Sequence, residues 1–269
     1  MTTQLSVRAD ADAEAAGAVA AVVSSLPVSL KPADAATDLV AIAGSKGWTG
    51  RAGAAIRHGA KGVVVVRPQA EDAVALAAVA KENGAAVVLD QQWAGNPVLA
   101  ASRANVQNVL IVAVADAVLV DSVAYAAPGT DPDALLTEHL AVILKCGLEV
   151  TGWQAVQRNR HGYVVTGRLS SGAPLALHGV LTSSVPATAS MSILTASGRA
   201  DVMLPDPSAA WPAEVRSVTA DGSTTLPTIY ETAHRHAWTR LRDQVASGTP
   251  GSDLEHFAAL ASLVSRLTN

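Results

Sequence analysis

Several features that mark common functional classes are missing from this chain. Cys146 is the one cysteine in 269 residues, which excludes an internal disulfide framework and a zinc site built from several cysteines. We expect no metal site. Aromatic residues make up 3% of the chain, and Asp and Glu outnumber Lys and Arg by 23 to 19. Without a basic block, a nucleic-acid partner is not expected.

Long hydrophobic runs are missing as well. The most apolar stretch, Asn108 to Tyr125, contains Asp116 and Asp121 and is too short to cross a membrane uninterrupted. Near the N-terminus, Arg8 and Asp10 lie where a signal peptide would need a clean apolar segment. We therefore expect a cytoplasmic protein with no membrane partner.

Hydrophobic residues make up 49% of the chain, enough for a folded core. In the first third, short β-branched runs alternate with alanine-rich amphipathic stretches. We predict strands over Gln4–Ala9, Asp38–Ala43, Gly62–Val66 and Ala85–Leu89, and helices over Asp12–Ser24, Thr49–Gly59 and Gln69–Gly84. Strands this hydrophobic, alternating with helices, indicate a parallel sheet covered on both faces.

The pattern changes after Pro97. We predict a strand near Asp116–Tyr125, a helix over Asp133–Lys145, and then long runs of alternating polarity joined by turn signals. Such runs are typical of an antiparallel sheet with one wetter face. Two helices, Thr228–Ser247 and Ser252–Leu267, close the chain. The fold class is α/β: an incomplete Rossmann-like domain over 1–97, then an α+β domain with a large open, mostly antiparallel sheet over 98–269.

Several segments together resemble the glucose–fructose oxidoreductase/inositol dehydrogenase (Gfo/Idh/MocA) family. DLVAIAG (38–44) is similar to the strand before the family's nicotinamide-side loop, and KGVVVVRP (61–68) to the strand that ends in Glu-Lys-Pro. LLTEHL (135–140) lies where the family has its Asp-x-x-x-His helix, and GAPLALHGVLTSS (172–184) resembles strands of its second sheet. The resemblance implies an NAD(P)-dependent oxidoreductase fold with a substrate and oligomerisation sheet.

Departures from the family pattern bear on the cofactor. No G-x-G-x-x-G occurs in the N-terminal third, and the resemblance makes Gln4–Asp10 the second strand, so we expect a truncated member without the first strand and glycine loop. Those glycines let backbone amides approach the pyrophosphate. Asp10 would then take the place of the acid that binds the ribose, or be a solvated acid at a helix start.

The catalytic positions depart too. The resemblance places Arg67 at the family's lysine, and arginine keeps the charge but does not readily exchange a proton. His139 matches the family's histidine, while Leu135 replaces its aspartate. His139 is therefore either a base toward an alcohol or a helix histidine with its tip at the surface.

Two further clusters are candidates for ligand binding, one for an anion and one for a metal ion. Ser45 and Lys46, in GSKGWTG, offer backbone amides and a cation ahead of a helix, a candidate anion-binding loop; the alternative is a plain surface loop. His234 and His236 are two residues apart and point to different faces of a helix. With Glu231, His234 could join a metal site, but a solvated helix face is the favoured interpretation.

Three functions compete. The favoured one is an oxidoreductase-like pseudoenzyme that has lost its dinucleotide-dependent chemistry. For this function we expect no cofactor. It would act as a partner subunit, forming a homo-oligomer or pairing with a full-length relative through its C-terminal sheet. The second is an NAD(P)-dependent oxidoreductase for a sugar-like or cyclic polyol alcohol with an unconventional cofactor site, using Asp10, Ser45, Lys46, Arg67 and His139. The third is a sensor or carrier of a sugar-like small molecule.

Overall fold

The computed structural model describes residues 4–34, 37–100, 103–209 and 211–268. The chain divides into two compact units, the first comprising Met1–Gly95 and Ala233–Leu263 and the second Asn96–Thr232 and Val264–Asn269. From the sequence we predicted that the whole C-terminal region belongs to the second domain. In the structure, a helix from that region packs against strands of unit 1.

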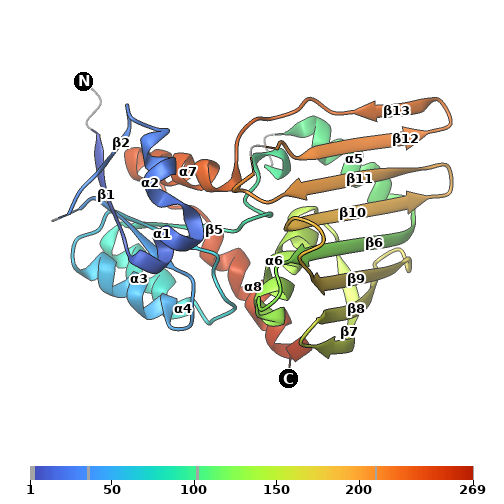
Figure 1. Ribbon diagram of the computed structural model, residues 1–269, viewed down its shortest axis with the longest axis horizontal. Coiled ribbons are helices and arrows are strands. Elements are labelled where there is room, and N and C mark those ends of the chain that lie inside the picture. Colours follow the sequence, from blue (N-terminus) through green and yellow to red (C-terminus); the bar gives the residue numbers. More distant parts are fainter. Residues whose placement is uncertain (1–3, 35–36, 101–102, 210, 269) are drawn as a thin grey trace. The chain divides into compact units, whose positions relative to one another are not determined.

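Unit 1 contains a five-stranded sheet in the order β2-β1-β3-β4-β5, and every neighbouring pair is parallel (Figure 1). Its strands are β1 (Leu5–Ala9), β2 (Leu30–Pro32), β3 (Leu39–Ala43), β4 (Gly62–Val66) and β5 (Ala86–Asp90). All residues of β3, β4 and β5 are buried. The predicted parallel sheet is confirmed, and the continuous Val and Ile runs reflect burial on both faces.

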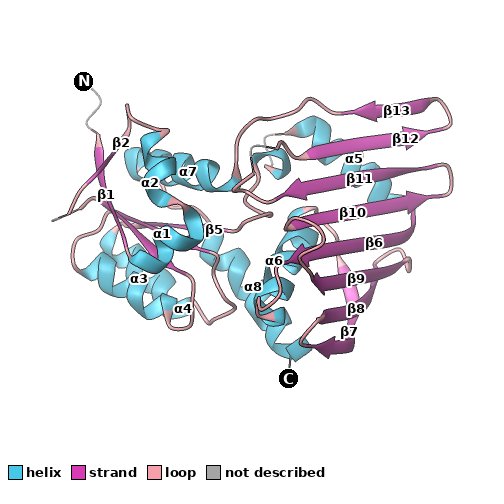
Figure 2. Cartoon of the chain, in the orientation of Figure 1, coloured by secondary structure: helices cyan, strands magenta, loops and turns pink. Residues whose placement is uncertain are grey.

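Helices cover this sheet (Figure 2). They are α1 (Ala11–Gly17), α2 (Val19–Ser24), α3 (Trp48–Arg57), α4 (Val74–Asn83) and α7 (Ala233–Ser247), followed by α8 (Asp253–Thr268). The helix predicted over 12–24 is broken in two because Ala18 is left-handed, with φ 46°. There Gly17 allows close packing, since a Cβ on it would lie 2.9 Å from Val66 Cγ1.

β1 lies inside the sheet, hydrogen-bonded to β2 on one side and β3 on the other. If the first strand of the common dinucleotide-binding order 3-2-1-4-5-6 is left out, the remaining strands have the order 3-2-4-5-6. Numbered along this chain, that order is β2-β1-β3-β4-β5, as observed. The expected absence of the first strand therefore stays a prediction.

Unit 2 contains an eight-stranded mixed sheet in the order β13-β12-β11-β10-β6-β9-β8-β7. Its strands are β6 (Ala117–Ala126), β7 (Val150–Asn159), β8 (Gly162–Leu169), β9 (Pro174–Leu181), β10 (Thr188–Thr195), β11 (Gly198–Pro205), β12 (Glu214–Thr219) and β13 (Gly222–Thr225). The pair β6–β9 is parallel and the others are antiparallel. The second sheet was predicted, but β12 and β13 were not identified as strands.

One face of this sheet is covered. Helix α6 (Pro132–Lys145) packs against β6, β8 and β9, and α5 (Ala104–Ala115) against β10 and β11. Along β6 and β10, buried residues alternate with partly exposed ones, as expected when only one face is packed. A short 3₁₀ helix, Pro97–Leu99, precedes α5. Among the described residues, no helix is long and apolar enough to span a membrane.

Candidate functional site at the carboxyl edge of the first sheet

The order of the strands locates a ligand site in unit 1. From β1 the chain goes to β2 on one side, and from β2 it crosses to β3 on the other side of β1, so the order reverses between β1 and β3. In open parallel sheets, ligands bind beyond the carboxyl ends of the strands at such a switch point. Asp10 follows β1 here, and Gly44, Ser45 and Lys46 follow β3. The three predicted cofactor-binding residues therefore lie in the two segments that leave this edge.

Asp10 caps the N-terminus of α1 at this edge. α1 begins directly after it, and its carboxylate caps the helix: Oδ1 accepts a hydrogen bond of 2.6 Å from the Ala13 amide. Oδ2 accepts a bond of 3.3 Å from the Ala43 amide at the end of β3. Asp10 thus joins the two strand ends and neutralises the helix terminus with the protein's own negative charge.

The loop after β3 is held by hydrogen bonds to side chains of the protein itself. Arg51 of α3 donates to the carbonyl oxygens of Ala43 (2.8 Å), Ser45 (2.9 Å) and Lys46 (2.8 Å). The Gly47 amide donates to the carboxylate of Glu71, which also accepts from the Thr49 hydroxyl. In the anion-binding loop that we predicted, this amide would be free. Ser45 and Lys46 are exposed.

Arg67 follows β4, and the last residue of β5, Asp90, forms a pair with His234 that the sequence did not predict. Arg67 is exposed and left-handed, with φ 51°, and its amide donates to the Asp90 carbonyl (2.9 Å). The Asp90 carboxylate lies 2.7 Å from Nδ1 of His234 on α7, and both residues are buried. The expectation that His234 lies on a solvated helix face is wrong. Among the described residues, no group of three or more His, Cys, Asp or Glu could hold a metal ion.

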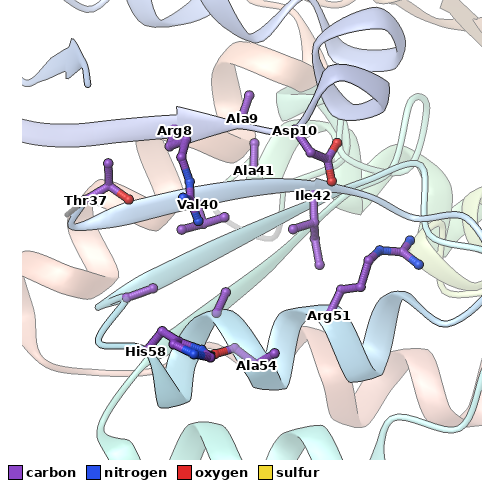
Figure 3. Close-up of a pocket in the computed structure, with 12 residues that line it drawn as sticks. Arg8, Ala9, Asp10, Thr37, Val40, Ala41, Ile42, Arg51, Ala54 and His58 are labelled. Atoms are coloured by element: carbon purple, nitrogen blue, oxygen red, sulfur yellow. The ribbon is translucent and has the colours of Figure 1, made fainter. Parts of the chain in front are cut away.

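A pocket of about 680 Å³ opens beside Asp10. Figure 3 shows Arg8 extending from β1 across Val40, with Asp10 and Arg51 toward one end and Thr37 and His58 toward the other. The remaining lining residues are apolar: Ala9, Val40, Ala41, Ile42, Ala54, Ala55 and Ala60. Between β2 and β3, the described residues form no helix that would cover this face. The size and the mixed lining suit a small-molecule ligand.

His139 lies in unit 2, packed between α6 and the sheet. It is fully buried, so the expectation of a surface histidine is wrong. Its Nε2 lies 2.7 Å from the Ser122 hydroxyl on β6, and its Nδ1 lies 2.9 Å from the Tyr163 hydroxyl on β8. Gly179 makes room for this arrangement, because a Cβ on it would lie 2.2 Å from the Tyr163 ring.

The direction of these bonds fixes the protonation of His139. The Ser122 hydroxyl donates its single hydrogen to the Ser190 carbonyl (2.7 Å), so it accepts from His139 Nε2–H. Nδ1 then accepts from the Tyr163 hydroxyl. Burial, together with the charge of nearby His178, lowers the pKa of His139 to about 3. His139 is a neutral core residue with both nitrogens engaged, which leaves neither free to take a proton from a substrate.

Comparison with known proteins identifies solved structures that have a similar fold. No protein-family model and no curated protein matches the chain. Among solved structures, a variant of a 3-ketoreductase from Actinomadura kijaniata, in complex with TDP-benzene and NADP, matches with a TM-score of 0.71 at 16% identity over 98% of this chain and 96% of that one. The chain has the fold of this ketoreductase.

Two other solved structures agree. A UDP-N-acetylglucosamine 3-dehydrogenase from Acidithiobacillus ferrooxidans matches with a TM-score of 0.65 at 14% identity, covering 96% of this chain and 87% of that one. A dehydrogenase from Chromobacterium violaceum gives 0.62 at 16%, covering 97% and 86%. At this identity the likeness concerns the fold. Among structures of the ketoreductase, it covers 88–97% of that chain.

The NADP bound in the ketoreductase raises the question of whether these residues fit such a cofactor. A pyrophosphate needs free amides at a helix N-terminus. Here the Ala13 amide at α1 is bonded to Asp10, and the Gly47 amide at α3 to Glu71. At these two helix termini of the described residues, an amide that could bind a pyrophosphate is therefore already bonded to a carboxylate. The pocket beside Asp10, with its apolar floor and cationic side chains, does fit the adenosine portion of a nucleotide.

Proposed function

We propose that the chain is an NAD(P)-dependent oxidoreductase acting on a sugar-like or cyclic polyol alcohol, with an unconventional cofactor site. The observation that carries the proposal is the pocket between β1, β3 and α3. Its Asp10 end reaches the carboxyl edge of the sheet at the β1–β3 switch point, where this class of sheet binds nucleotides. The nearly full-length likeness to the NADP-bound ketoreductase supports it. The favoured function from the sequence, a partner subunit without catalysis, receives no such support from the comparisons.

In this proposal the residues of unit 1 bind and orient the nucleotide. Val40 and Ile42 form an apolar floor for the adenine ring, and Arg8 and Arg51 supply positive charge at its border. Asp10 keeps the phosphates away from α1, so they would follow a different path from that in glycine-loop enzymes. When bound, the dinucleotide supplies or accepts the hydride.

The proton that accompanies the hydride needs another residue. His139 is held neutral by its hydrogen bonds and burial, and a guanidinium such as that of Arg67 is a charged hydrogen-bond donor rather than an acid–base group. His234 is bonded to Asp90 at the carboxyl end of β5, and a histidine oriented by a carboxylate is a common general acid–base arrangement. We propose it as the residue to test in place of His139.

The test is calorimetric titration of NAD⁺, NADH, NADP⁺ and NADPH into the purified full chain. Binding at about 10 μM or tighter, roughly −7 kcal/mol, supports the proposal. Spectroscopic detection of hydride transfer with a panel of sugars and cyclic polyols would then establish the reaction. Absence of heat at millimolar cofactor would refute it.

A second candidate is the non-catalytic partner subunit. It is favoured by one observation, that the carboxylates of Asp10 and Glu71 occupy the two helix termini at the edge of the sheet. In that case the open sheet of unit 2 would assemble with a second copy or with a full-length relative. A chain that binds no dinucleotide but sediments as an oligomer would favour it, whereas stabilisation by a sugar without turnover would indicate a sensor or carrier.

A further inference from the structure

Helix α5 of unit 2 has an exposed apolar side. Its inner side packs against β10 and β11, whereas Ile111 and Val112 on its outer side are each 64% exposed. Exposed residues at intervals of four, three and four follow one side of this helix: Ala104, Asn108, Ile111 and Ala115. Single exposed apolar residues are common, but a contiguous stripe of them marks an interaction surface.

This helix contains no charged residue. Its sequence is ANVQNVLIVAVA, although charged residues make up 16% of the chain. In a two-fold contact the same surface of both copies is used, so a face with charges of one sign would repel itself. The neutral side of α5 avoids this cost, which favours a second copy of the same chain as its partner.

The two charges that flank α5 are opposite to those that a helix prefers. Arg103 is the N-cap residue and Asp116 is the C-cap residue. Because the N-terminus of a helix is partly positive and its C-terminus partly negative, each charge is unfavourable for its own helix. Within the described residues neither forms an ion pair: Arg103 Nη2 lies 3.5 Å from the Pro227 carbonyl oxygen, and Asp116 is exposed.

We infer that two copies of this chain associate through α5, with the two helices antiparallel. Arg103 of one copy then lies beside Asp116 of the other, twice in each dimer, and each charge lies at the favourable end of the neighbouring helix. The same pairing puts Ala104 opposite Ala115, whose small side chains allow the helices to approach closely, and both Ile111 side chains near the two-fold axis. A parallel pair would instead bring like charges together.

This contact goes beyond the proposed function and does not depend on it. It uses the helix-covered side of unit 2, and not the open side of the sheet that the family resemblance implies for assembly. A pair of short helices is a small interface, below the roughly 800 Å² per partner of a standard complex. We therefore expect a weak dimer, with a dissociation constant of about 10–100 μM.

The test is sedimentation equilibrium of the full chain at low salt, over concentrations that span this constant. Arg103→Glu and Asp116→Lys should each weaken the dimer about tenfold or more, because each turns two attractive pairs into repulsive ones. Both changes place a charge that suits the helix end, so the fold should be kept. The double variant should regain most of the affinity, and an equimolar mixture of the two single variants should form a heterodimer.

A matched pair of valines tests the apolar part of the contact. Val112→Ser should weaken the dimer, whereas Val156→Ser, at a valine of β7 that is 60% exposed, should leave it unchanged. A chain that stays monomeric overturns the inference, as does a dimer that the charge reversals do not weaken. The outcome is separate from that of the cofactor titration, because none of these residues lines the pocket of unit 1.

Discussion

The buried His139 should make the protein lose stability in mild acid. In the unfolded chain a histidine titrates near pH 6.5, whereas burial lowers the pKa of His139 in the folded state to about 3. Below pH 6.5 the unfolded state therefore takes up a proton that the folded state excludes. The stability contributed by neutral His139 is fully present above pH 6.5 and is lost as the pH falls toward 3.

The magnitude follows from the linkage relation. Each pH unit in the steep part of this window costs about 1.4 kcal/mol, so the fall from pH 6.5 to 4.5 should cost about 2 kcal/mol. The pKa values of Asp38 and Asp201 are also lowered, from 3.8, so these carboxylates contribute only at more acidic pH. The interval from 6.5 to 4.5 thus isolates His139 among the groups with a shifted pKa.

The assay is urea unfolding at a series of pH values from 7.5 to 4.5 for the wild type and His139→Gln. The variant should be less stable at neutral pH, because its buried partners Ser122 and Tyr163 lose well-aligned bonds, but its stability should fall less steeply with acid. His161→Gln, at an exposed position of unit 2, should keep the wild-type slope. Equal slopes for the wild type and His139→Gln would refute the assignment of His139 as a neutral core residue.

Three further predictions follow from other contacts. Gly179→Ala should destabilise the fold by about 1–3 kcal/mol, because its Cβ would displace the Tyr163 ring and break the bond to His139; thermal melting beside Gly50→Ala, where a Cβ meets nothing within 4 Å, measures it. Asp10→Ala should cost about 1 kcal/mol of stability by removing the cap, yet tighten dinucleotide binding in calorimetry by removing a negative charge; weaker binding would refute the repulsion argument. Asp38→Asn should lower stability at neutral pH by about 1–2 kcal/mol, since hydrogen bonds from Lys61 and Ser6 lower the pKa of Asp38 to about 2, and this difference should shrink as the pH falls from 3.8 toward 2 in denaturant titrations.

The sequence by itself determined the class of each half of the fold. The uninterrupted Val and Ile runs of β3, β4 and β5 indicate strands buried on both faces, and period-2 alternation in the second half indicates a sheet with one packed face. It also directed attention to Asp10, since an acid directly before a helical pattern is a recognisable cap. The pairing of β1 with β3 across a long connection has no local signal, so the sequence could not show that these two strands are neighbours.

Only the tertiary structure decided what the candidate residues do. Glu71 reaches Gly47 across 24 residues of chain, Asp90 meets His234 across 144, and Tyr163 meets His139 from another strand. Such contacts depend on packing between elements, which propensity and periodicity do not encode. Arg8 carried a weak signal, a charge on the face opposite Val7, but its pocket exists because of how β1, β3 and α3 pack. The sequence therefore named Asp10 and His139, and the fold made one a cap and the other a buried neutral residue.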